Sequence, residues 1–501
     1  MSNEQNIATE SLPVKGLVLD RSDPFKIAQA FVRFRLRKRE ASLIFYRNGF
    51  YTWGGRCYRE VEDSWLRSRV YRFLDGAVVH IRVGNETVEE RFKPDDRIVN
   101  KVIDALKSRP EVWISSDLQS PCWLPGASKE QCAHDPADLF VVANGLVDLK
   151  TGDLLAHSSE LLTMNAVDYD FDPTATCPRW HRFLSEVQPS DLQVQQMLAE
   201  MFGYMLTPDT SQQKIFALIG VRRSGKGTIA RVLEALLGGT ANVAHPTMDA
   251  LRERFGLWNL IDKKAAIVGD ARLDGKTLTV VERLLSMSGE DGIDIDRKHA
   301  KPWTGKLGVR FLILSNELPG FSDESGTIPT RFILGHFRQS FAGQEDPGLT
   351  ETLLRERSGI LNWAIAGLRR LRDRGHFVQP DSSGEIIELM KHIANPLIKF
   401  VRDRCILDPT GECCVSEEIL ADAVKQWREG NGHSGRLSKT GLHKSLLAIA
   451  PYIKLRRPGE RGAQVYKYFG IKLRKLDDIP EPSEKVVPIR SSRASCIGDI
   501  A

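Results

Sequence analysis

The chain has 501 residues, of which 70 are Lys or Arg and 65 are Asp or Glu, so its net charge at neutral pH is only +5. A hydrophobic content of 42% and a charged content of 27% are ordinary for globular proteins, which excludes a largely disordered, collagen-like or coiled-coil chain. No stretch approaches the roughly 18 uninterrupted apolar residues of a membrane span, and the first residues lack the basic start and apolar run of a signal peptide. Eight irregularly spaced cysteines are too few for a disulfide scaffold. We therefore expect a multidomain cytosolic protein with no membrane partner.

The first 135 residues alternate short strand patterns with amphipathic helices, which predicts one small α+β domain. Asn48-Gly49 separates two apolar runs and predicts a hairpin, because Asn and Gly tolerate the positive φ angles of a tight turn. A helix is predicted further along by apolar residues at helical spacing, namely Val99, Val102, Ile103 and Leu106. No catalytic pattern stands out in this domain.

Four further regions follow in the chain, and together they predict an α/β fold. Residues 136–205 contain two extended runs and then a helical bridging region, and residues 206–378 alternate strands with helices, as in a sheet with crossover helices. Residues 390–475 predict three helices followed by a pair of basic strands. Residues 476–501 mix Pro, Ser and charges, which is typical of a flexible tail.

The strongest local pattern is a glycine loop between a strand and a helix. The apolar run 214–219 precedes Gly220-Val-Arg-Arg-Ser-Gly-Lys-Gly-Thr228, and apolar residues then recur on one helix face. In such loops backbone N–H groups point at phosphate oxygens, glycines let the backbone approach, and the lysine brings positive charge to the β- and γ-phosphates. We therefore predict a nucleotide site formed by Gly220, Ser224, Gly225, Lys226, Gly227 and Thr228.

One position departs from the common form of this loop. Gly227 follows Lys226 where the common form has the hydroxyl residue that binds Mg²⁺, and Thr228 comes one position later. We expect Thr228 to take the metal-binding role. The Gly-Lys-Gly-Thr form also occurs in nucleoside monophosphate kinases, so the loop predicts nucleotide binding without choosing the reaction.

Two polar residues follow buried strands. Asp270 ends the run 265–269 and suits the carboxylate that holds hydrated Mg²⁺, although an acid that caps the next helix is the alternative. Asn316 ends the run 309–315 and is placed to hydrogen-bond attacking water or the γ-phosphate, with a turn residue as the alternative. Ligands of α/β sheets bind outside the carboxyl ends of the strands. We therefore expect Lys226, Asp270 and Asn316 to share one crevice as catalytic residues.

A fourth catalytic candidate, Arg331, enters an apolar strand. We predict that it acts as an arginine finger on the nucleotide of a neighbouring subunit, and the alternative is a salt-bridged strand-end arginine. Gly269 and Ala271 flank Asp270, so the second acid that would orient water is missing. The catalytic base stays unassigned among Glu282, Glu290 and Asp291.

The order of these motifs resembles the superfamily 3 helicases, AAA+-like ring ATPases of small viruses, phages, poxviruses and plasmids. The resemblance covers about residues 140–375 and is closest to the helicase part of phage and plasmid primase-helicases. It rests on Gly220–Thr228, Ile267-Val-Gly-Asp270, the segments 285–291 and 302–305, Leu314–Pro319 and Arg331. The resemblance implies a P-loop AAA+-like ATPase core that uses ATP and Mg²⁺ and assembles as a homo-hexameric ring around single-stranded DNA.

The resemblance also implies DNA contacts. Members of the family project a basic hairpin, located between the Asp strand and the Asn strand, into the ring pore; here this interval holds Arg297, Lys298, His299, Lys301 and Lys306. A positive loop tracks a phosphate backbone without reading bases, and a solvated loop is the alternative. The region 390–475 is similar to the winged-helix domains that often follow these ATPases. That similarity implies DNA contacts by Lys439 and Lys444 near a recognition helix and by Arg456, Arg457 and Arg461.

These expectations favour an ATP-dependent DNA helicase that replicates a phage, plasmid or other mobile element in the cytosol of a bacterial host. Its expected partners are single-stranded and forked DNA, further copies of itself, and a separate primase or other replication proteins. We expect no primer synthesis, because residues 1–135 contain no cluster of metal-binding carboxylates. One alternative is an origin-binding, ATP-regulated assembly switch without processive unwinding. A nucleotide kinase is less favoured, since no acceptor-binding lid is evident and the basic C-terminal region would be unexplained.

Overall fold

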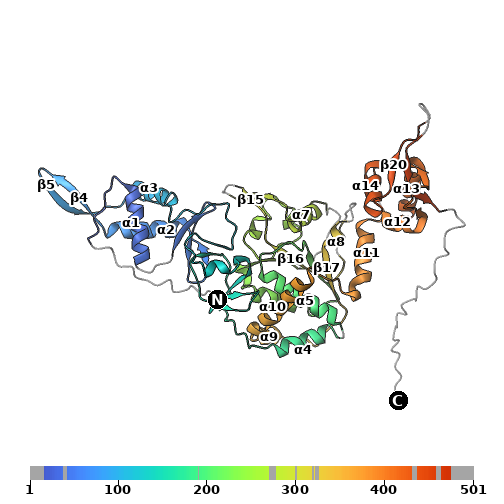
Figure 1. The fold of residues 1–501 in the computed structure, drawn as a ribbon, viewed down its shortest axis with the longest axis horizontal. Coiled ribbons are helices and arrows are strands. Elements are labelled where there is room, and N and C mark those ends of the chain that lie inside the picture. Colours follow the sequence, from blue (N-terminus) through green and yellow to red (C-terminus); the bar gives the residue numbers. More distant parts are fainter. Residues whose placement is uncertain are drawn as a thin grey trace, which may run out of the picture. The chain divides into compact units, whose positions relative to one another are not determined.

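We analysed a computed structural model of the chain, which describes residues 16–37, 42–189, 191–269, 278–298, 302–318, 321, 327–431, 437–458 and 464–474. The fold is mixed α/β, as predicted (Figure 1). The chain forms two compact units, one comprising residues 1–319 and 331–386 and the other residues 320–330 and 387–501. Among the residues described, no helix is long and apolar enough to cross a membrane.

The N-terminal part of the first unit packs three helices around an apolar core. Its elements are α1 (Pro24–Arg37), β1 (Leu43–Tyr46), β2 (Gly49–Trp53), β3 (Tyr58–Glu60), α2 (Asp63–Asp75), β4 (Val78–Val83), β5 (Glu86–Arg91) and α3 (Asp96–Lys107). The apolar positions predicted for α3 are all buried, so this helix is confirmed. Asp95 caps α3 by accepting a hydrogen bond from the N–H of Ile98 at 2.9 Å.

The predicted hairpin forms between β1 and β2, but its turn lies one residue earlier than expected. Arg47 and Asn48 have φ angles of 47° and 66°, whereas Gly49 pairs with Tyr46 as the first residue of β2. A Cβ on Gly49 would lie 2.8 Å from Oε1 of Glu60 on the next strand, a flexible side-chain end that can move aside. Arg47 and Asn48 therefore occupy the two left-handed positions of the turn.

Small strands and two helices connect this part to the sheet. The elements are β6 (Cys122–Trp123), η1 (Gln131–Ala133), η2 (Pro136–Asp138), β7 (Leu139–Val142), β8 (Gly145–Asp148), β9 (Leu154–Leu155), β10 (Leu161–Leu162), α4 (Pro178–Val187) and α5 (Leu192–Leu206). The extended runs and the helical segment predicted for this region are both present.

The centre of the first unit is a five-stranded parallel sheet of order β12-β13-β16-β11-β17. Its strands are β11 (Ile215–Gly220), β12 (Val243–Ala244), β13 (Ala265–Val268), β16 (Arg310–Ser315) and β17 (Phe332–Phe337). β11 and β13 are buried along their whole length, which explains their continuous apolar sequences. The other elements are α6 (Lys226–Leu236), η3 (Gly239–Ala241), η4 (Ala250–Arg252), η5 (Trp258–Leu260), α7 (Leu278–Ser288), β14 (Ile293–Ile295), β15 (Trp303–Gly305), α9 (Leu349–Leu354), α10 (Arg357–Arg374) and η6 (Asp381–Ser383). The short helix α8 (Ile328–Arg331) belongs to the second unit except for its last residue, Arg331.

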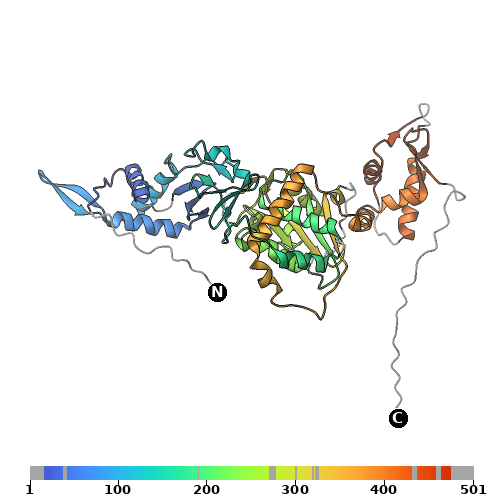
Figure 2. The same ribbon diagram turned by 60° about the horizontal axis from the view of Figure 1, so that its bottom comes forward.

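The helices α5 and α10 pack closely along one another (Figure 2). A Cβ on Gly203 of α5 would lie 2.2 Å from the carbonyl oxygen of Ala364, and a Cβ on Gly367 of α10 would lie 2.2 Å from that of Ala199. The two backbones can therefore approach only because a glycine stands on each side. Buried Glu200 of α5 adds ion pairs to Arg370 and Arg374 of α10, whose side chains are partly exposed.

The second unit contains three helices around an apolar core and short antiparallel sheets. Its elements are α11 (Gly384–Ala394), which begins in the first unit, α12 (Leu397–Arg404), β18 (Cys405–Leu407), β19 (Cys414–Ser416), α13 (Glu417–Gly430), α14 (Lys439–Ile449), β20 (Lys454–Arg456), β21 (Lys467–Phe469) and β22 (Ile471–Leu473). From α12 onward the described part of the chain forms two strands, two helices and then three strands, which make one sheet of order β19-β21-β20 and one of order β18-β22. The three predicted helices and the basic strand pair are present.

Candidate functional site

The glycine loop lies at the carboxyl end of β11 and leads directly into α6. Gly220 has a φ of 148°, and a Cβ there would lie 1.9 Å from the carbonyl oxygen of Phe337 on β17. Gly225 precedes α6 with a φ of 89°, and a Cβ there would lie 2.7 Å from Cγ1 of Val187. Both glycines are therefore required by backbone conformation and by close packing.

Lys226 is the first residue of α6 and is buried. Its Nζ donates hydrogen bonds to the carbonyl oxygens of Gly220 and Val221, both at 2.7 Å, and to Oγ of Ser224 at 3.0 Å. Burial lowers the pKa of Lys226 below its ordinary value. All of these acceptors are neutral, so the buried ammonium group is arranged to gain from an incoming anion.

Asn316 follows β16, the neighbour of β11 in the sheet, and its Oδ1 lies 3.4 Å from Nζ of Lys226. The structure therefore brings these two predicted residues together. Asp270 and Ala271 lie outside the described residues. The strand that precedes Asp270 in the sequence, β13, is the other neighbour of β16 in the sheet, and Val268 of β13 lies opposite Ile313. The three strand ends thus belong to adjacent strands at one edge.

The first turn of α6 offers backbone donors and one hydroxyl group. Gly225 has no side chain to cap the helix, and the first hydrogen bond of this turn runs from the N–H of Ile229 to the oxygen of Gly225. Within the part of the chain that the structure describes, the preceding N–H groups are therefore free for an anion. Oγ1 of Thr228 accepts a hydrogen bond from Nη2 of Arg231 at 3.1 Å. A metal ion on this oxygen therefore requires Arg231 to move. Gly227 lies under the same side chain, since a Cβ there would be 3.4 Å from Nη1 of Arg231.

The role of Arg231 beside Thr228 was not predicted from the sequence. It stands three residues after Thr228 on the same helix, a spacing that places two side chains on one face, and this spacing could have identified it.

Arg331 lies at the opposite end of the sheet from Lys226. It immediately precedes β17, whose first residue, Phe332, pairs with Ile215 at the start of β11. Six residues of strand at about 3.3 Å each separate the two ends by about 20 Å. Nη1 of Arg331 donates a hydrogen bond to Oε1 of Gln213, a neutral partner. Arg331 therefore does not reach the loop of its own chain.

The basic interval between the Asp and Asn strands forms an antiparallel hairpin of β14 and β15. Lys298 and Lys306 are exposed, and Arg297 is partly buried. His299 and Lys301 lie outside the described residues.

Positive side chains also gather on the second unit. Lys439 begins α14 and its Nζ lies 3.3 Å from Oε2 of Glu417, while Lys444 is exposed on the same helix. On the strand pair, the guanidinium group of Arg456 lies 5.5 Å from the ring centroid of Phe469, and that of Arg457 lies 5.3 Å from that of Tyr466. Arg461 lies outside the described residues.

Two family models match the chain. The model described as "D5 N terminal like" matches residues 33–189, and the model described as "Family of unknown function (DUF5906)" matches residues 218–331, the range from β11 to Arg331. The D5-like match supports a replication protein of the phage primase-helicase type.

Solved structures of the NrS-1 C-terminal region are also similar to the chain. The similarity to two A-form apo structures covers 89% of this chain and 99% of the solved chain, with TM-scores of 0.48 and 0.47. The similarity to a further apo structure, of residues 305–718, covers 90% of this chain and 100% of the solved chain, with a TM-score of 0.49. Sequence identity is 12% in each case.

Proposed function

We propose that the protein is an ATP-dependent DNA helicase of the superfamily 3 type, acting in the replication of a phage, plasmid or other mobile element. The observation that carries the proposal is the contact between Lys226 and Asn316, which joins the glycine loop to the end of the neighbouring parallel strand. A lysine and a polar strand-end residue in this relation suit a P-loop ATPase core of the AAA+ type.

The residues of the glycine loop and the neighbouring strand ends would have separate roles in ATP hydrolysis. Lys226 and the free N–H groups of α6 would bind the phosphates, and the amide group of Asn316 would orient the attacking water near the γ-phosphate. The neutral partners of Lys226 and the uncapped helix start fit a phosphate group. Bound Mg²⁺ would neutralise charge on the phosphates, with Asp270 as its expected protein ligand.

The location of Arg331 favours a ring. Because it lies about 20 Å from its own glycine loop, an arginine finger at this position must serve the nucleotide of an adjacent copy. This requirement supports the proposed homo-hexamer, in which the hairpin of β14 and β15 would present Lys298 to single-stranded DNA. The order of helices and strands in the second unit suits a winged helix, which would hold duplex or forked DNA through Arg456 and Arg457.

The test is ATP hydrolysis by the full chain with and without single-stranded DNA at fixed moderate salt, followed by strand displacement on a forked duplex. Lys226→Ala is the blank, and Lys150→Ala, which removes an exposed lysine from a turn, is the matched control. We expect severalfold stimulation by DNA in the wild type and the control, and no turnover in the blank.

Other outcomes would contradict the proposal. A folded ring that hydrolyses ATP but displaces no strand would exclude the helicase. Tight binding to one duplex sequence with negligible turnover would favour the origin-binding assembly switch, and transfer of phosphate to a nucleotide acceptor would favour the kinase.

A further inference from the structure

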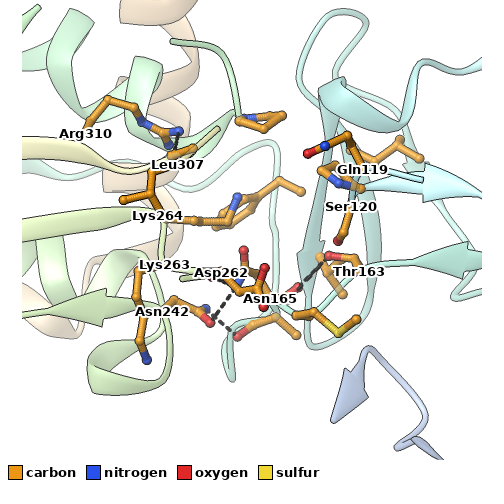
Figure 3. Close-up of a pocket in the computed structure, with 18 of the residues that line it drawn as sticks. Gln119, Ser120, Thr163, Asn165, Asn242, Asp262, Lys263, Lys264, Leu307 and Arg310 are labelled. Carbon is orange, nitrogen blue, oxygen red and sulfur yellow. Dashed lines mark hydrogen bonds between the residues drawn. The ribbon is translucent and has the colours of Figure 1, made fainter. Parts of the chain in front are cut away.

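A cavity of about 280 Å³ lies at the amino ends of the parallel strands, the edge opposite to the glycine loop. One wall comes from residues at or just before β13 and β16, including Lys264 and Arg310, and from residues that follow β15. The other wall comes from segments 119–121 and 163–167, with Arg47 from the turn between β1 and β2. Figure 3 shows the two walls facing one another. The volume lies near the lower end of the range for small-ligand sites, about 300–1,000 Å³.

Two cations in the first wall are held by carbonyl groups. Nζ of Lys264 donates to the oxygen of Leu206 at 2.7 Å, and the guanidinium group of Arg310 donates to those of Met205, at 2.8 Å, and Thr207. These carbonyls lie at the end of α5, so the helix C-terminus fixes both cations. Arg310 is 3% exposed, and its Nε has no hydrogen-bond partner among the described residues.

These two cations form an electrostatically unbalanced pair. Burial and the proximity of Arg310 lower the pKa of Lys264 to about 7. Within the described part of the chain, no hydrogen bond or ion pair joins either side chain to a carboxylate. Burial lowers the pKa of Arg310 to about 10 and outweighs the electrostatic attraction of Asp209 for this arginine. Adjacent positive charges at low dielectric are stabilised by an anion, which makes this wall a favourable place for a phosphate group.

Each of the two walls contributes a further cation, Lys306 in the first wall and Arg47 in the second. The guanidinium group of Arg47 lies 5.9 Å from the ring centroid of Trp303 and 3.7 Å from Oδ1 of Asp262. Lys306 follows β15 and is exposed. Lys263 also lines the cavity. Asp262 is the one acid among the described lining residues, so the five cations Arg47, Lys263, Lys264, Lys306 and Arg310 outnumber it. The cavity therefore favours negative charge.

The remaining lining groups suit a nucleobase. Nδ2 of Asn165 donates to Oδ1 of Asn242 and to the carbonyl oxygen of Asp262, both at 3.1 Å, which joins the two walls (Figure 3). Amide side chains carry the donors and acceptors that recognise base edges. Trp303 adds an aromatic ring, on which a base of any sequence can stack.

We propose that this cavity is a second nucleotide site, in which a phosphate group contacts Lys264, Lys306 and Arg47 and the base lies against Trp303. The occupant is a nucleoside monophosphate unit, whether free in solution or part of a single strand of DNA. A strand would reach the cavity along β15, because Lys306 continues the basic hairpin toward it.

The test is calorimetric titration of deoxythymidine monophosphate into the full chain carrying Lys226→Ala, which blocks the glycine loop and removes any dependence on ATP turnover. We expect saturable binding that Lys264→Met and Lys306→Met each weaken about tenfold, since each removes a charge-assisted contact. Lys150→Met is the matched control, because this lysine is exposed in a turn and lies outside the lining of the cavity. Inorganic phosphate, which has no base, should bind much more weakly.

A second arm measures binding of a short fluorescent oligothymidylate to the same variants. Weaker oligonucleotide binding in Lys264→Met and Lys306→Met identifies a DNA strand as the source of the nucleotide, and an effect confined to the monophosphate identifies a free nucleotide. Lys306→Met alters an exposed side chain, so it keeps the test decisive if Lys264→Met fails to fold. The proposal is overturned by absence of saturable monophosphate binding, by equal weakening in Lys150→Met, or by phosphate binding as tightly as the nucleotide.

Discussion

Gln213 accepts a hydrogen bond from Arg331 at the amino edge of the sheet, and among the residues that the structure describes no salt bridge joins this arginine to an acid. Gln213 has a φ of 52°, an uncommon conformation that turns the chain just before β11. The arginine is thus positioned by a neutral partner, which keeps its positive charge available to another molecule.

Replacing Arg331 by Ala should lower the rate of ATP hydrolysis about 10³-fold or more and leave nucleotide affinity within about twofold. Arg369→Ala, which removes an exposed arginine of α10, should change neither quantity. Mixing Arg331→Ala with Lys226→Ala chains should restore part of the activity, since mixed rings contain interfaces in which both groups are intact. Mixtures as inactive as the separate variants would contradict an arginine finger in trans.

Asn316→Ala should lower the turnover rate about a hundredfold while nucleotide binding persists, because the amide group lies beside the phosphate-binding ammonium without being its main partner. Asn316→Asp should weaken nucleotide binding as well, since a carboxylate at this position would pair with Lys226 and compete with the phosphate. Separate measurements of nucleotide affinity and turnover distinguish the two effects. Equal behaviour of the two variants would argue against the assigned contact.

Gly367→Ala should destabilise the first unit by about 1–3 kcal/mol, because the added Cβ would lie 2.2 Å from the carbonyl oxygen of Ala199. The thermal unfolding midpoint should fall by about 2–4 °C for each kcal/mol. Gly384→Ala is the control, since a Cβ there meets nothing within 4 Å. An unchanged midpoint in Gly367→Ala would show that α5 and α10 can separate at little cost.

The depressed pKa of Lys264 predicts a pH dependence of stability. Its folded-state pKa of about 7 lies below the ordinary value of 10.5, so between these values the unfolded chain binds more protons than the folded chain. This residue therefore contributes an increase in stability as pH rises through that window. Chemical denaturation at the two ends of the window should reveal a smaller rise in Lys264→Met than in the wild type, and an identical rise would contradict the pKa assignment.

Arg457→Ala should weaken duplex DNA binding and reduce the slope of log affinity against log salt by about 0.9, the contribution of one phosphate contact. Lys425→Ala, an exposed substitution on α13, should leave the slope unchanged. Titrations at several salt concentrations measure the slope directly. A loss of affinity with an unchanged slope would point to a packing effect of the Arg457–Tyr466 contact instead.

Local patterns in the sequence were sufficient for many elements. The spacing of apolar residues in α3 and the strand, loop and helix around Lys226 reflect interactions within a few residues, and the structure has both. The turn between β1 and β2 lies one residue earlier than predicted, because Gly49 pairs with Tyr46 and leaves Arg47 and Asn48 as the central residues of the turn.

Contacts between segments that are distant in the chain could not be predicted from the sequence. The cavity joins Arg47, Asn165, Asp262 and Trp303, each separated from the next along the chain by 41 to 118 residues, and nothing local to any of them indicates the others. The glycines at 203 and 367 likewise look like weak helix positions until the two helices are placed together. The position of Arg331 at the opposite edge follows from strand direction and could have been anticipated once the sheet was taken as parallel.

The hydrogen bonds of Lys226 to its own loop have a kinetic consequence. A phosphate that enters must exchange places with the oxygens of Gly220, Val221 and Ser224, so arrival of the nucleotide and closure of the loop around it are separate events. The observed rate of association should then reach a plateau at high nucleotide concentration, and the plateau should equal the rate at which the ammonium group breaks its hydrogen bonds to these oxygens.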